Sequence, residues 1–536
     1  MPLKAQDILD RLEREQANRQ LRRQIRRIEE FVTGRESGSG GDDVPVLFFN
    51  ASTRIHRLSI NAAYSLLSSW RIRLAEIPVY YATCTEGMVQ CILGTNREDY
   101  QAPPLCKHCV PFSNLIFPND RLLPITMNKD LATSIAPELQ DKSLQDLSEW
   151  EYDELPLGEL CLPGLRWALR RHHLPDDEPT RSLYRQYLTS AANLAEAFGR
   201  MLDDYSPRAL VLFNGITYPE AVARKVAQRA GIHVVTHEVG LRPYSAFFSH
   251  SDATIRNVDL TPDYVLSKAE DDRLNTYLED RFRGQFTMAG IHFWPEMTSI
   301  PEALQEQMAG YSQIVPIFTN VIFDTSQIHA NVIFDDMFAW LDDIQDVVLQ
   351  HPETLFIIRA HPDEDRPGKE SRESVSDWFQ SSRLREAKNV IFYPPSEYIS
   401  SYELIRDAKF VMVYNSSIGL EASLMGVAVL CAGRARYTQI PTTYFPSSRS
   451  EYLDYFERFL ISERVNVPSI FIENARRFLN YELYYASLDL SEFLKPYPRT
   501  KGMVLFEDFE PESLQASQSL EIISDGILQG KPFVMT

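Results

Sequence analysis

Short, continuously apolar runs alternate with helix-compatible stretches between residues 355 and 433. The apolar runs are rich in Val, Ile and Phe and do not alternate with polar residues, as expected for parallel strands that are covered on both faces. They are the runs 355–360, 390–393, 410–414 and 427–431. The helical stretches are 373–386, 398–406 and 418–425. Because parallel neighbours need crossover connections, the pattern predicts a doubly wound α/β domain, in which ligands bind beyond the carboxyl ends of the strands.

The same alternation occurs in the first half of the chain. The expected strands there are 45–50, 78–83, 209–213 and 232–236, with helices at 58–72 and 218–230. A mostly helical insertion, 120–205, interrupts them, and its long helix lies near 180–204. A strand at 314–319 and a helix at 332–349 open the second domain. We therefore predict an α/β fold of two Rossmann-type doubly wound domains that face each other across a cleft.

The positions of these elements divide the chain into five parts. We expect a charged N-terminal helix followed by a Gly- and Ser-rich, flexible linker. Two Rossmann-like domains follow, and a C-terminal tail packs back on them. The parts are 1–33 for the helix, 34–43 for the linker, 44–285 for the first domain with a Cys-rich insertion at 84–110, 286–490 for the second domain and 491–536 for the tail.

Length and charge exclude several classes of protein. A chain of 536 residues is too long for one hydrophobic core. Its 54 Lys and Arg against 74 Asp and Glu give a net charge of −20, which argues against general nucleic-acid binding because that depends on basic side chains. No apolar run is long enough to span a membrane, and the first residues lack the apolar core of a signal peptide. We therefore expect a cytoplasmic protein.

Residues 5–32 are expected to form a charged helix. Its apolar stripe includes Ile8, Leu12, Ile25 and Ile28. One interpretation is a solvated helix or a short coiled coil that pairs two copies of the chain. The other is peripheral contact with a partner or with the inner membrane, because the second half of the helix is basic. The basic residues are Arg19, Arg22, Arg23, Arg26 and Arg27.

In the second domain, His361 and Pro362 directly follow the strand 355–360. The imidazole is left at the carboxyl edge of the sheet, where it could donate a hydrogen bond to a phosphate and stabilise a leaving group. Arg359, two residues before His361, lies on the same face as His361 if the strand is regular. The alternative is a histidine that only caps the start of a loop. Further candidates at this edge are Thr319, Asn320, Arg434 and Arg436.

Asn415, Ser416 and Ser417 follow the strand 410–414 and precede a helix. A helix N-terminus and two hydroxyls are suited to phosphate, and Gly419 would allow close approach of the backbone. Glu421 could accept both hydroxyls of a ribose. The alternative is an ordinary Ser N-cap with an acidic first turn.

The first domain also ends its strands in polar residues. Transfer to a hydroxyl group needs a base near the acceptor, and Glu238 is the first candidate, with His237 the second. Asn214 and Gly215 form a turn after another strand. Arg54, in the first loop after a strand, could bind an anionic acceptor. We therefore expect the acceptor in this domain.

Four of the six cysteines lie within 26 residues, at Cys84, Cys91, Cys106 and Cys109. Four thiolates in a tetrahedral arrangement would suit a structural Zn²⁺, and His108 is a spare ligand. Free thiols are the main alternative, and an iron–sulfur cluster is another. So long a chain with few cysteines does not indicate a disulfide framework.

The motifs of the second domain resemble those of bacterial capsule polysaccharide biosynthesis proteins. They are also similar to those of the related Kdo transferases and polysialyltransferases. The resemblance rests on His361-Pro362, on Asn415-Ser416-Ser417 with Glu421, and on the segment 319–324. It implies a GT-B glycosyltransferase fold. It also implies that His361, Ser416 and Ser417 hold the phosphate of a CMP-activated sugar and that Glu421 binds the ribose or the base.

From this resemblance we expect a glycosyltransferase of surface-polysaccharide assembly, without a metal at the reaction centre. The donor would be a CMP-sugar or another nucleotide sugar, and the acceptor a saccharide or a lipid-linked molecule. His361 would contribute to catalysis at the leaving phosphate. The alternatives are a nucleotide-sugar epimerase or a polyol-phosphate transferase on the same fold, and a non-catalytic scaffold that binds partners.

Overall fold

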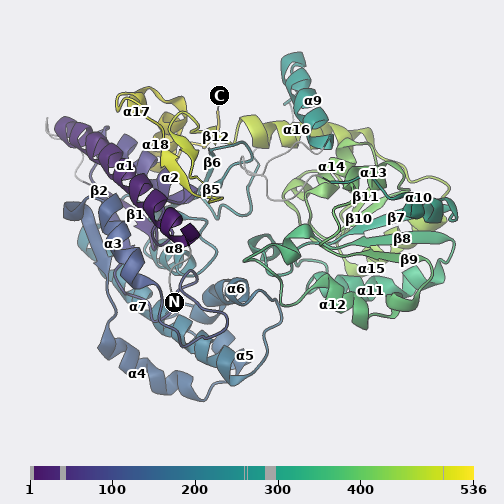
Figure 1. Ribbon diagram of the computed structural model, residues 1–536, viewed down its shortest axis with the longest axis horizontal. Helices are drawn as coiled ribbons and strands as arrows, with labels where there is room; N and C mark the ends of the chain where they lie inside the picture. The colour runs from purple at the N-terminus through teal and green to yellow at the C-terminus, as the bar shows by residue number, and fades with distance from the viewer. Residues whose placement is uncertain are drawn as a thin grey trace.

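The computed structural model describes most of the chain and folds it into two lobes (Figure 1). The described residues are 5–36, 44–258, 260–261, 264–283, 297–498 and 500–535. The first lobe contains segments from both ends of the chain. The second lobe is built mainly from the segment between α10 (Glu302–Ala309) and α15 (Arg449–Ile461).

A seven-stranded sheet forms the centre of the first lobe, with the order β12-β6-β5-β4-β1-β2-β3. Its strands are β1 (Val46–Asn50), β2 (Val79–Cys84), β3 (Leu122–Ile125), β4 (Ala209–Phe213), β5 (His233–Val239), β6 (Ser245–Ser249) and β12 (Leu488–Asp489). The strands from β5 to β3 are parallel, and β6 and β12 extend the β5 edge with antiparallel pairs. Every residue of β1 is buried, because helices cover both faces of the sheet.

The helices of the first lobe form two layers around this sheet. One layer holds α1 (Ala5–Arg35), α2 (Ile60–Arg73), α3 (Cys106–Ile116), α17 (Ser513–Ala516) and α18 (Gln518–Gln529). The other layer holds α4 (Lys129–Gln140), α5 (Leu144–Ser148), α6 (Leu157–Leu169), α7 (Glu178–Tyr205) and α8 (Glu220–Arg229). Successive residues of β1 contribute to opposite layers, as the alternation of side chains in a strand requires.

The sheet of the second lobe has five strands, all parallel, in the order β11-β10-β7-β8-β9. The strands are β7 (Gln313–Phe318), β8 (Thr354–Arg359), β9 (Val390–Tyr393), β10 (Val411–Val413) and β11 (Val429–Cys431). One face is covered by α11 (Met337–Gln350), α12 (Val375–Ser381) and α15. The other is covered by α9 (Lys268–Phe282), α10, α13 (Ser401–Arg406), α14 (Ile418–Leu424) and α16 (Ser469–Tyr484).

In each sheet the strand order reverses between two neighbouring parallel strands. The reversal lies between β1 and β4 in the first lobe and between β7 and β10 in the second. Loops that leave the carboxyl ends of such strands turn to opposite faces and leave a crevice, which is where open α/β sheets bind ligands. The topology therefore fixes one expected binding crevice in each lobe.

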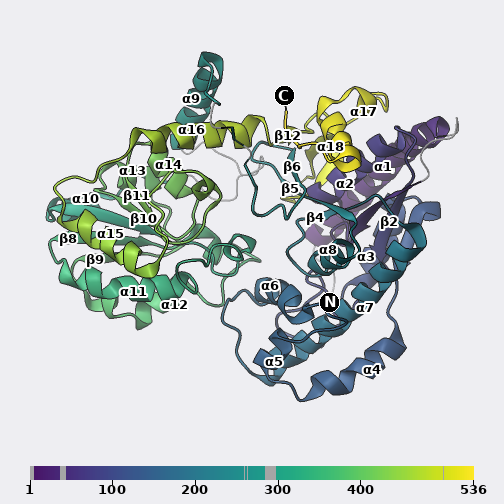
Figure 2. The ribbon, with the colours of Figure 1, turned by 180° about the vertical axis from the view of Figure 1, so that it is seen from behind.

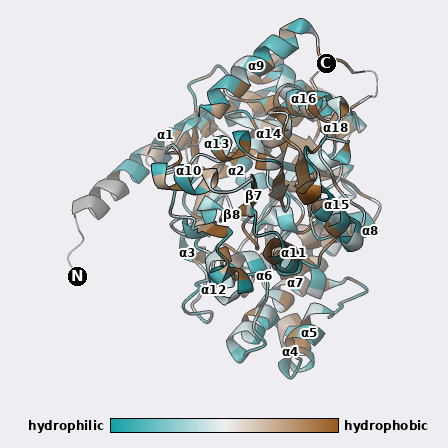
Figure 3. Cartoon of the chain, turned by 90° about the vertical axis from the view of Figure 1, so that its right-hand side faces the viewer, coloured by the Kyte–Doolittle hydropathy of each residue, from teal (hydrophilic) through white to brown (hydrophobic). Residues whose placement is uncertain are grey.

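After α15 the chain runs through α16 back to the first lobe, where β12 pairs with β6 (Figure 2). A short hairpin of β13 (Leu494–Pro496) and β14 (Val504–Phe506) follows. Hydrophobic residues gather toward the middle of the molecule, while the outer helix α9 is largely hydrophilic (Figure 3). Within the part of the chain that the structure describes, no helix is long and apolar enough to cross a membrane.

The expected fold class is confirmed, since both lobes are doubly wound α/β units. The insertion at 120–205 is less helical than expected, because its strand β3 adds an edge strand to the first sheet. This strand is short and contains Pro124, so its sequence gives only a weak strand signal. The helix expected at 332–349 begins later, at Met337, where the Asp336 side chain caps its N-terminus. Most of the expected linker and the expected start of the second domain lie outside the described residues.

The apolar stripe of α1 packs into the core of the first lobe. Leu21, Ile25, Ile28 and Val32 are buried against α2 and its neighbours. At the same interface, Arg73 of α2 forms ion pairs with Glu29 and Glu36 of the α1 segment, at 2.6 and 2.8 Å. The second half of the stripe is therefore used within the chain, and the exposed side of the helix there is basic. Leu12, in the first half, is 57% exposed, and pairing of two copies through this helix stays a prediction.

Candidate functional site

Three neighbouring cavities lie where the two lobes meet. The carboxylate cavity, about 330 Å³, contains Glu220 and Glu238 of the first lobe. The bridging cavity, about 300 Å³, is lined from both lobes, and the aromatic cavity, about 250 Å³, contains Tyr277 and Tyr402. Side chains shared by the carboxylate and bridging cavities are Trp167, Asp324 and Lys369. Those shared by the bridging and aromatic cavities are His361, Ser416, Ser417 and Arg436. The three cavities therefore follow one another along one cleft.

The second lobe brings most of its predicted site residues to this cleft. They come from the loops after β7, β8, β10 and β11, which share the carboxyl edge of the sheet. The residues that line the bridging or the aromatic cavity are Thr319, Asn320, Arg359, His361, Asn415, Ser416, Ser417, Glu421 and Arg434. The crevice between β7 and β10 is thus the place where these side chains meet.

His361 caps a short 3-10 turn, which agrees with the alternative that this histidine caps the start of a loop. Its Nδ1 accepts a hydrogen bond from the Asp363 backbone N–H at 3.1 Å. The ring hydrogen of the neutral tautomer is therefore on Nε2. Burial lowers the pKa of His361, which favours this neutral form. Its presence in two cavities shows that the side chain also faces the cleft, so the capping role does not remove it from the site.

The Ser416 and Ser417 side chains do not serve as ordinary helix caps. Ser417 occupies the N-cap position of α14, but its side chain makes no capping hydrogen bond. Within the described parts of the chain, neither serine hydroxyl has a hydrogen-bond partner, although both residues line two cavities. Unused hydroxyls at a cavity wall are suited to a polar ligand.

Asn415 holds the surrounding loops together. Its Oδ1 accepts hydrogen bonds from Asn320 Nδ2 at 2.8 Å and from Gln327 Nε2 at 3.0 Å. Its Nδ2 donates to the Ser326 carbonyl at 3.1 Å. These contacts join the loop after β10 to the loop after β7. Asn415 therefore positions the neighbouring serines with its side chain already engaged.

Gly419 does not line any of the three cavities. A Cβ at this position would lie 2.3 Å from the hydroxyl oxygen of Tyr437 and 3.0 Å from Val413. The Tyr437 hydroxyl donates to the Ser416 carbonyl at 2.7 Å. Glycine is therefore needed here so that Tyr437 can support the serine loop, rather than for approach of a ligand to the backbone.

Glu421 lines the aromatic cavity, but both of its carboxylate oxygens are engaged. Arg281 of α9 contacts Oε1 at 2.5 Å, and the Tyr402 hydroxyl donates to Oε2 at 2.5 Å. The side chain is 7% exposed. Glu421 thus joins α9 and α13 to α14 at the wall of the cavity. Contact with a ribose stays a prediction and would require these bonds to be shared.

In the first lobe, Glu238 lies in the carboxylate cavity at the end of β5. Burial raises the pKa of its carboxyl group, and the Val239 backbone N–H, Arg256 and Arg436 partly offset that rise. Since Arg436 belongs to the second lobe and lines the bridging cavity, Glu238 faces the side of the cleft that holds the phosphate candidates. A role for Glu238 as the base stays a prediction.

His237 lies differently from its neighbour. Its side chain is fully buried, and its Nε2 contacts the Ser65 hydroxyl of α2 at 3.1 Å. Burial lowers its pKa to about 3. It lines none of the three cavities. The alternation of β5 places it on the α2 side of the sheet, so direct contact with a substrate is not supported by the geometry.

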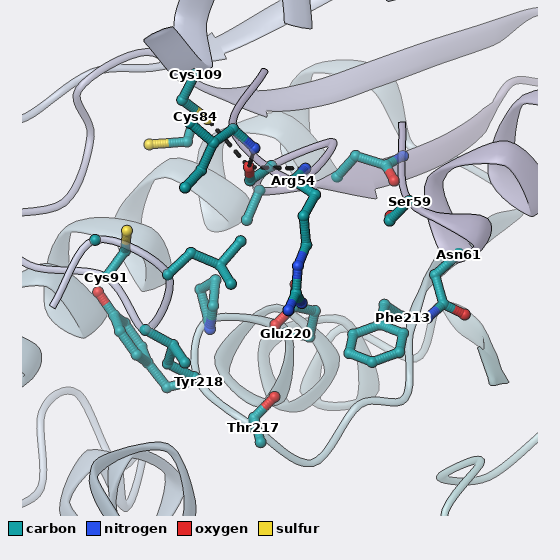
Figure 4. Close-up of a pocket in the computed structure, with 18 of the residues that line it drawn as sticks. Arg54, Ser59, Asn61, Cys84, Cys91, Cys109, Phe213, Thr217, Tyr218 and Glu220 are labelled. Atoms are coloured by element: carbon teal, nitrogen blue, oxygen red, sulfur yellow. Dashed lines mark hydrogen bonds between the residues drawn. The ribbon is translucent and has the colours of Figure 1, made fainter. Parts of the chain in front are cut away.

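Glu220 is a cavity residue that the sequence analysis missed. It is the first residue of α8, and it lines the carboxylate cavity shown in Figure 4. Apart from its own backbone N–H, no described group is bonded to its carboxyl. Burial raises its pKa to about 8. The available signal was its position, since an acidic residue in the first helical turn after a core strand also identified Glu421.

The three predicted acceptor residues follow β1 and β4 of the first sheet. Arg54 and Asn214 line the carboxylate cavity, and Arg54 has a positive φ of 90°. Burial lowers the pKa of Arg54. Gly215 does not line the cavity. Its φ is +79°, and a Cβ added to it would lie 2.9 Å from atoms of Arg224 and Thr236, which explains why glycine is required in this turn.

The four clustered cysteines all line the carboxylate cavity, and three of them are visible in Figure 4. Burial raises the pKa of Cys84 to about 11 and that of Cys91 to about 12. The Cys109 sulfur lies 3.1 Å from the Ser52 hydroxyl. Within the described ranges, no three of the cysteine sulfurs lie within 4.8 Å of one another. Zinc binding by Cys84, Cys91, Cys106 and Cys109 therefore stays a prediction.

Comparison with known proteins agrees with the resemblance seen in the motifs. Residues 295–445 match the family described as capsule polysaccharide biosynthesis protein, and this segment contains all five strands of the second-lobe sheet. The match covers this segment of the second lobe and agrees with the family suspected from the motifs. No curated protein matches the sequence significantly.

Several solved structures are similar to this chain at low identity. The KpsC β-Kdo 2,4-transferase of Thermosulfurimonas dismutans is 12% identical, with 58% of this chain and 87% of that chain covered and a TM-score of 0.36. The β-Kdo 2,7-transferase of the same KpsC is 14% identical, with coverage of 60% and 88% and a TM-score of 0.32. The UDP-GlcNAc 2-epimerase of Neisseria meningitidis bound to UDP-GlcNAc is 12% identical, with coverage of 82% and 98% and a TM-score of 0.25. At such scores the fold is better judged from the chain's own two sheets.

Proposed function

Because residues 295–445 match the capsule polysaccharide biosynthesis protein family, we propose that the chain is a glycosyltransferase. It moves a sugar from a nucleotide-activated donor to a surface-polysaccharide or lipid-linked acceptor. The observation that carries this proposal is the order of the three cavities. An aromatic cavity, a group of side chains suited to phosphate and a separate carboxylate-lined cavity follow one another along one cleft.

The donor occupies the second lobe in this proposal. Its base and ribose lie in the aromatic cavity, which tyrosines and Phe318 line. Its phosphate lies at the junction with the bridging cavity, where His361, the two serine hydroxyls and Arg436 meet. Neutral His361 donates from Nε2, and Arg436 supplies positive charge. These groups can offset the charge of the leaving phosphate without a metal at the reaction centre.

The acceptor enters from the carboxylate cavity, and Glu238 is the proposed general base. The acceptor hydroxyl oxygen forms a bond to the anomeric carbon of the donor sugar, and the bond from that carbon to the phosphate oxygen breaks. The nucleotide leaves with the electron pair, and the hydroxyl proton moves to the Glu238 carboxylate. Burial prepares Glu238 for this step, because it raises the pKa of the carboxyl above its usual value.

The size of the carboxylate cavity favours a transferase over the epimerase alternative. An epimerase changes one nucleotide sugar in place and needs no second substrate. Here a space of about 330 Å³ lies beyond the bridging cavity, and it has its own polar groups in Arg54, Glu220 and Glu238. A second substrate explains why such a space is attached to the donor site.

We also propose that α1 brings the first lobe to an anionic membrane surface, where a lipid-linked acceptor would be located. Arg22 and Arg23 are exposed on the side of α1 that faces away from the core. Their charge would add about 1 kcal/mol of attraction per residue near such a surface. The proposal concerns peripheral contact only.

A transfer assay tests the proposed function. Purified protein is incubated with CMP-, UDP- and GDP-sugars, with and without oligosaccharide acceptors, and the free nucleotide and the extended acceptor are measured. We expect acceptor-dependent release of one nucleotide. Glu238→Gln should lower kcat by about 100-fold or more with little change in donor KM, as loss of a general base does. Glu151→Gln, at an exposed position of the same lobe, is the matched control. Equal turnover by wild type and Glu238→Gln would contradict the assignment of the base.

A further inference from the structure

A group of potential metal ligands lies outside the three cavities, at a second contact between the lobes. His172 and His173 follow α6 in the first lobe, and Asp336 precedes α11 in the second. One ligand atom from each of these residues lies within 4.8 Å of the other two. Among the described residues, these are the three potential metal ligands whose ligand atoms all lie within 4.8 Å of one another. None of the three residues lines the carboxylate, bridging or aromatic cavity.

Both ring nitrogens of His173 contact carboxylates. Its Nε2 lies 3.1 Å from Asp336 Oδ2, a separation that suits two ligands of one ion. Its Nδ1 lies 2.5 Å from Glu373 Oε1. A carboxylate on the second ring nitrogen fixes the tautomer and the orientation of a metal-bound histidine. Glu373 is itself held, because its Oε2 accepts from the backbone N–H groups of His172 and His173 at 2.8 and 3.0 Å.

Only one of the two carboxylate oxygens of Asp336 is used to cap α11. Its Oδ1 accepts from the Phe338 and Ala339 backbone N–H groups at 2.7 and 3.0 Å, which caps α11. These bonds hold the carboxylate in place and leave Oδ2 directed at His173. The Asp336 side chain is 9% exposed, whereas that of His173 is 58% exposed, so the cluster is anchored on one side and open to solvent on the other.

We propose that His172, His173 and Asp336 bind a divalent transition-metal ion, Zn²⁺ or an ion of similar preference, that joins the two lobes. Two imidazoles and one carboxylate are a ligand set for such ions, with the fourth position open to water. Glu373 acts from outside the ligand set by orienting His173. The exposed side of His173 leaves room for that water. Without a metal, the same geometry is an ion pair in which a protonated His173 donates to both carboxylates.

The consequence of metal binding would be mechanical, since the ligands come from different lobes. The ion would hold the turn after α6 against the N-terminus of α11 and so limit the opening of the cleft. This site is independent of the proposed glycosyl transfer, and it is distinct from the predicted zinc site of the four cysteines. The two metal predictions differ in ligand chemistry, one with nitrogen and oxygen donors and the other with sulfur.

Cobalt titration separates these alternatives. The tag-free protein is treated with a chelator and dialysed, then titrated with Co²⁺ while its absorption spectrum is recorded, and Zn²⁺ affinity is measured by calorimetry. We expect one ion per chain with a visible d–d band. This band should be lost in His173→Gln and in Asp336→Asn, which keeps a capping side chain, and should persist in Cys106→Ser with Cys109→Ser. Glu373→Gln should weaken binding by about 10- to 100-fold, as expected for a second carboxylate on the histidine.

His351→Gln is the matched control, because His351 also lies between two carboxylates, Glu353 and Glu457, both at 3.0 Å. Among the described residues, it belongs to no group of three potential ligands. The variant should bind metal like the wild type. Circular dichroism verifies that each variant is folded. The proposal is overturned if wild type binds no Co²⁺ or Zn²⁺, or if His173→Gln binds it unchanged. A cobalt spectrum dominated by sulfur charge-transfer bands and lost only in the cysteine variant would overturn it in favour of the cysteine site.

Discussion

The half-buried carboxyl of Glu220, at the wall of the carboxylate cavity, should make the stability of the first lobe depend on pH. Its pKa is about 8 in the folded protein and 4.5 in the unfolded chain, because burial disfavours the charged form. Folding therefore takes up a proton between these two values. The stability of wild type is unaffected by this group below pH 4.5. It falls as the pH rises, and the loss is complete above about pH 8.

Glu220→Gln removes the charge and should remove this pH dependence. At about 1.4 kcal/mol per pKa unit, the rise to about 8 gives a ceiling of about 5 kcal/mol. The side chain is only half-buried at a water-accessible cavity wall, so screening reduces the effect, and we expect the variant to be more stable by about 1–2 kcal/mol at pH 9. At pH 5 the difference should be close to zero.

Urea denaturation of wild type, Glu220→Gln and the control Glu151→Gln at pH 5, 7 and 9 measures this effect. The midpoint of Glu220→Gln should move upward relative to wild type as the pH rises, while that of the control follows wild type. A constant difference between wild type and Glu220→Gln across the three pH values would refute the argument, because it would show that Glu220 does not take up a proton on folding.

Three further predictions concern the donor site, the contact between Arg256 and Glu482, and the membrane surface. Replacing Ser416 and Ser417 together by Ala should weaken nucleotide binding by about 5- to 30-fold in calorimetry, since each hydroxyl contributes about 1 kcal/mol. Arg256→Met should lower the Tm strongly, because it leaves Glu482 buried without its 3.4 Å partner, a loss of about 3–5 kcal/mol for a buried pair. Arg22→Glu with Arg23→Glu should reduce cosedimentation with anionic vesicles, and high salt should reduce wild-type binding in the same way. Unchanged binding, Tm or cosedimentation would contradict the respective assignment.

The second-lobe sheet was predictable because its strands are continuous runs of Val, Ile and Phe. Buried parallel strands must have such runs, and polar residues immediately after them must lie at the carboxyl edge. That reasoning alone placed His361, Ser416 and Ser417 at one crevice. Short edge strands could not be found in this way. β3 and β12 have few residues, and their pairing is set by tertiary contacts that leave no local pattern.

The roles of individual site residues were less predictable than their positions. Glycine at 419 is compatible with ligand approach and with tight packing, and only the 2.3 Å approach of the Tyr437 hydroxyl decides between them. A glutamate at position 421 could bind either a ribose or Arg281, so the sequence alone does not distinguish these two roles. His172 and His173 carry no sequence signal for their contact with Asp336, because that contact joins two lobes across 163 residues of chain. Such contacts depend on how the lobes are placed, which local patterns do not encode.

The most direct test of the central claim is a thermal-shift screen against CMP, CDP, UDP, GDP and ADP. It compares wild type with His361→Ala and with the control His351→Ala. A ligand that binds only the folded protein raises its Tm, and at a fixed ligand concentration the rise is larger for tighter binding. We predict that at least one nucleotide stabilises wild type and the control but not His361→Ala, which would also identify the donor base. If no nucleotide stabilises wild type, or if His361→Ala responds equally, the second-lobe crevice is not the donor site and the glycosyltransferase account fails.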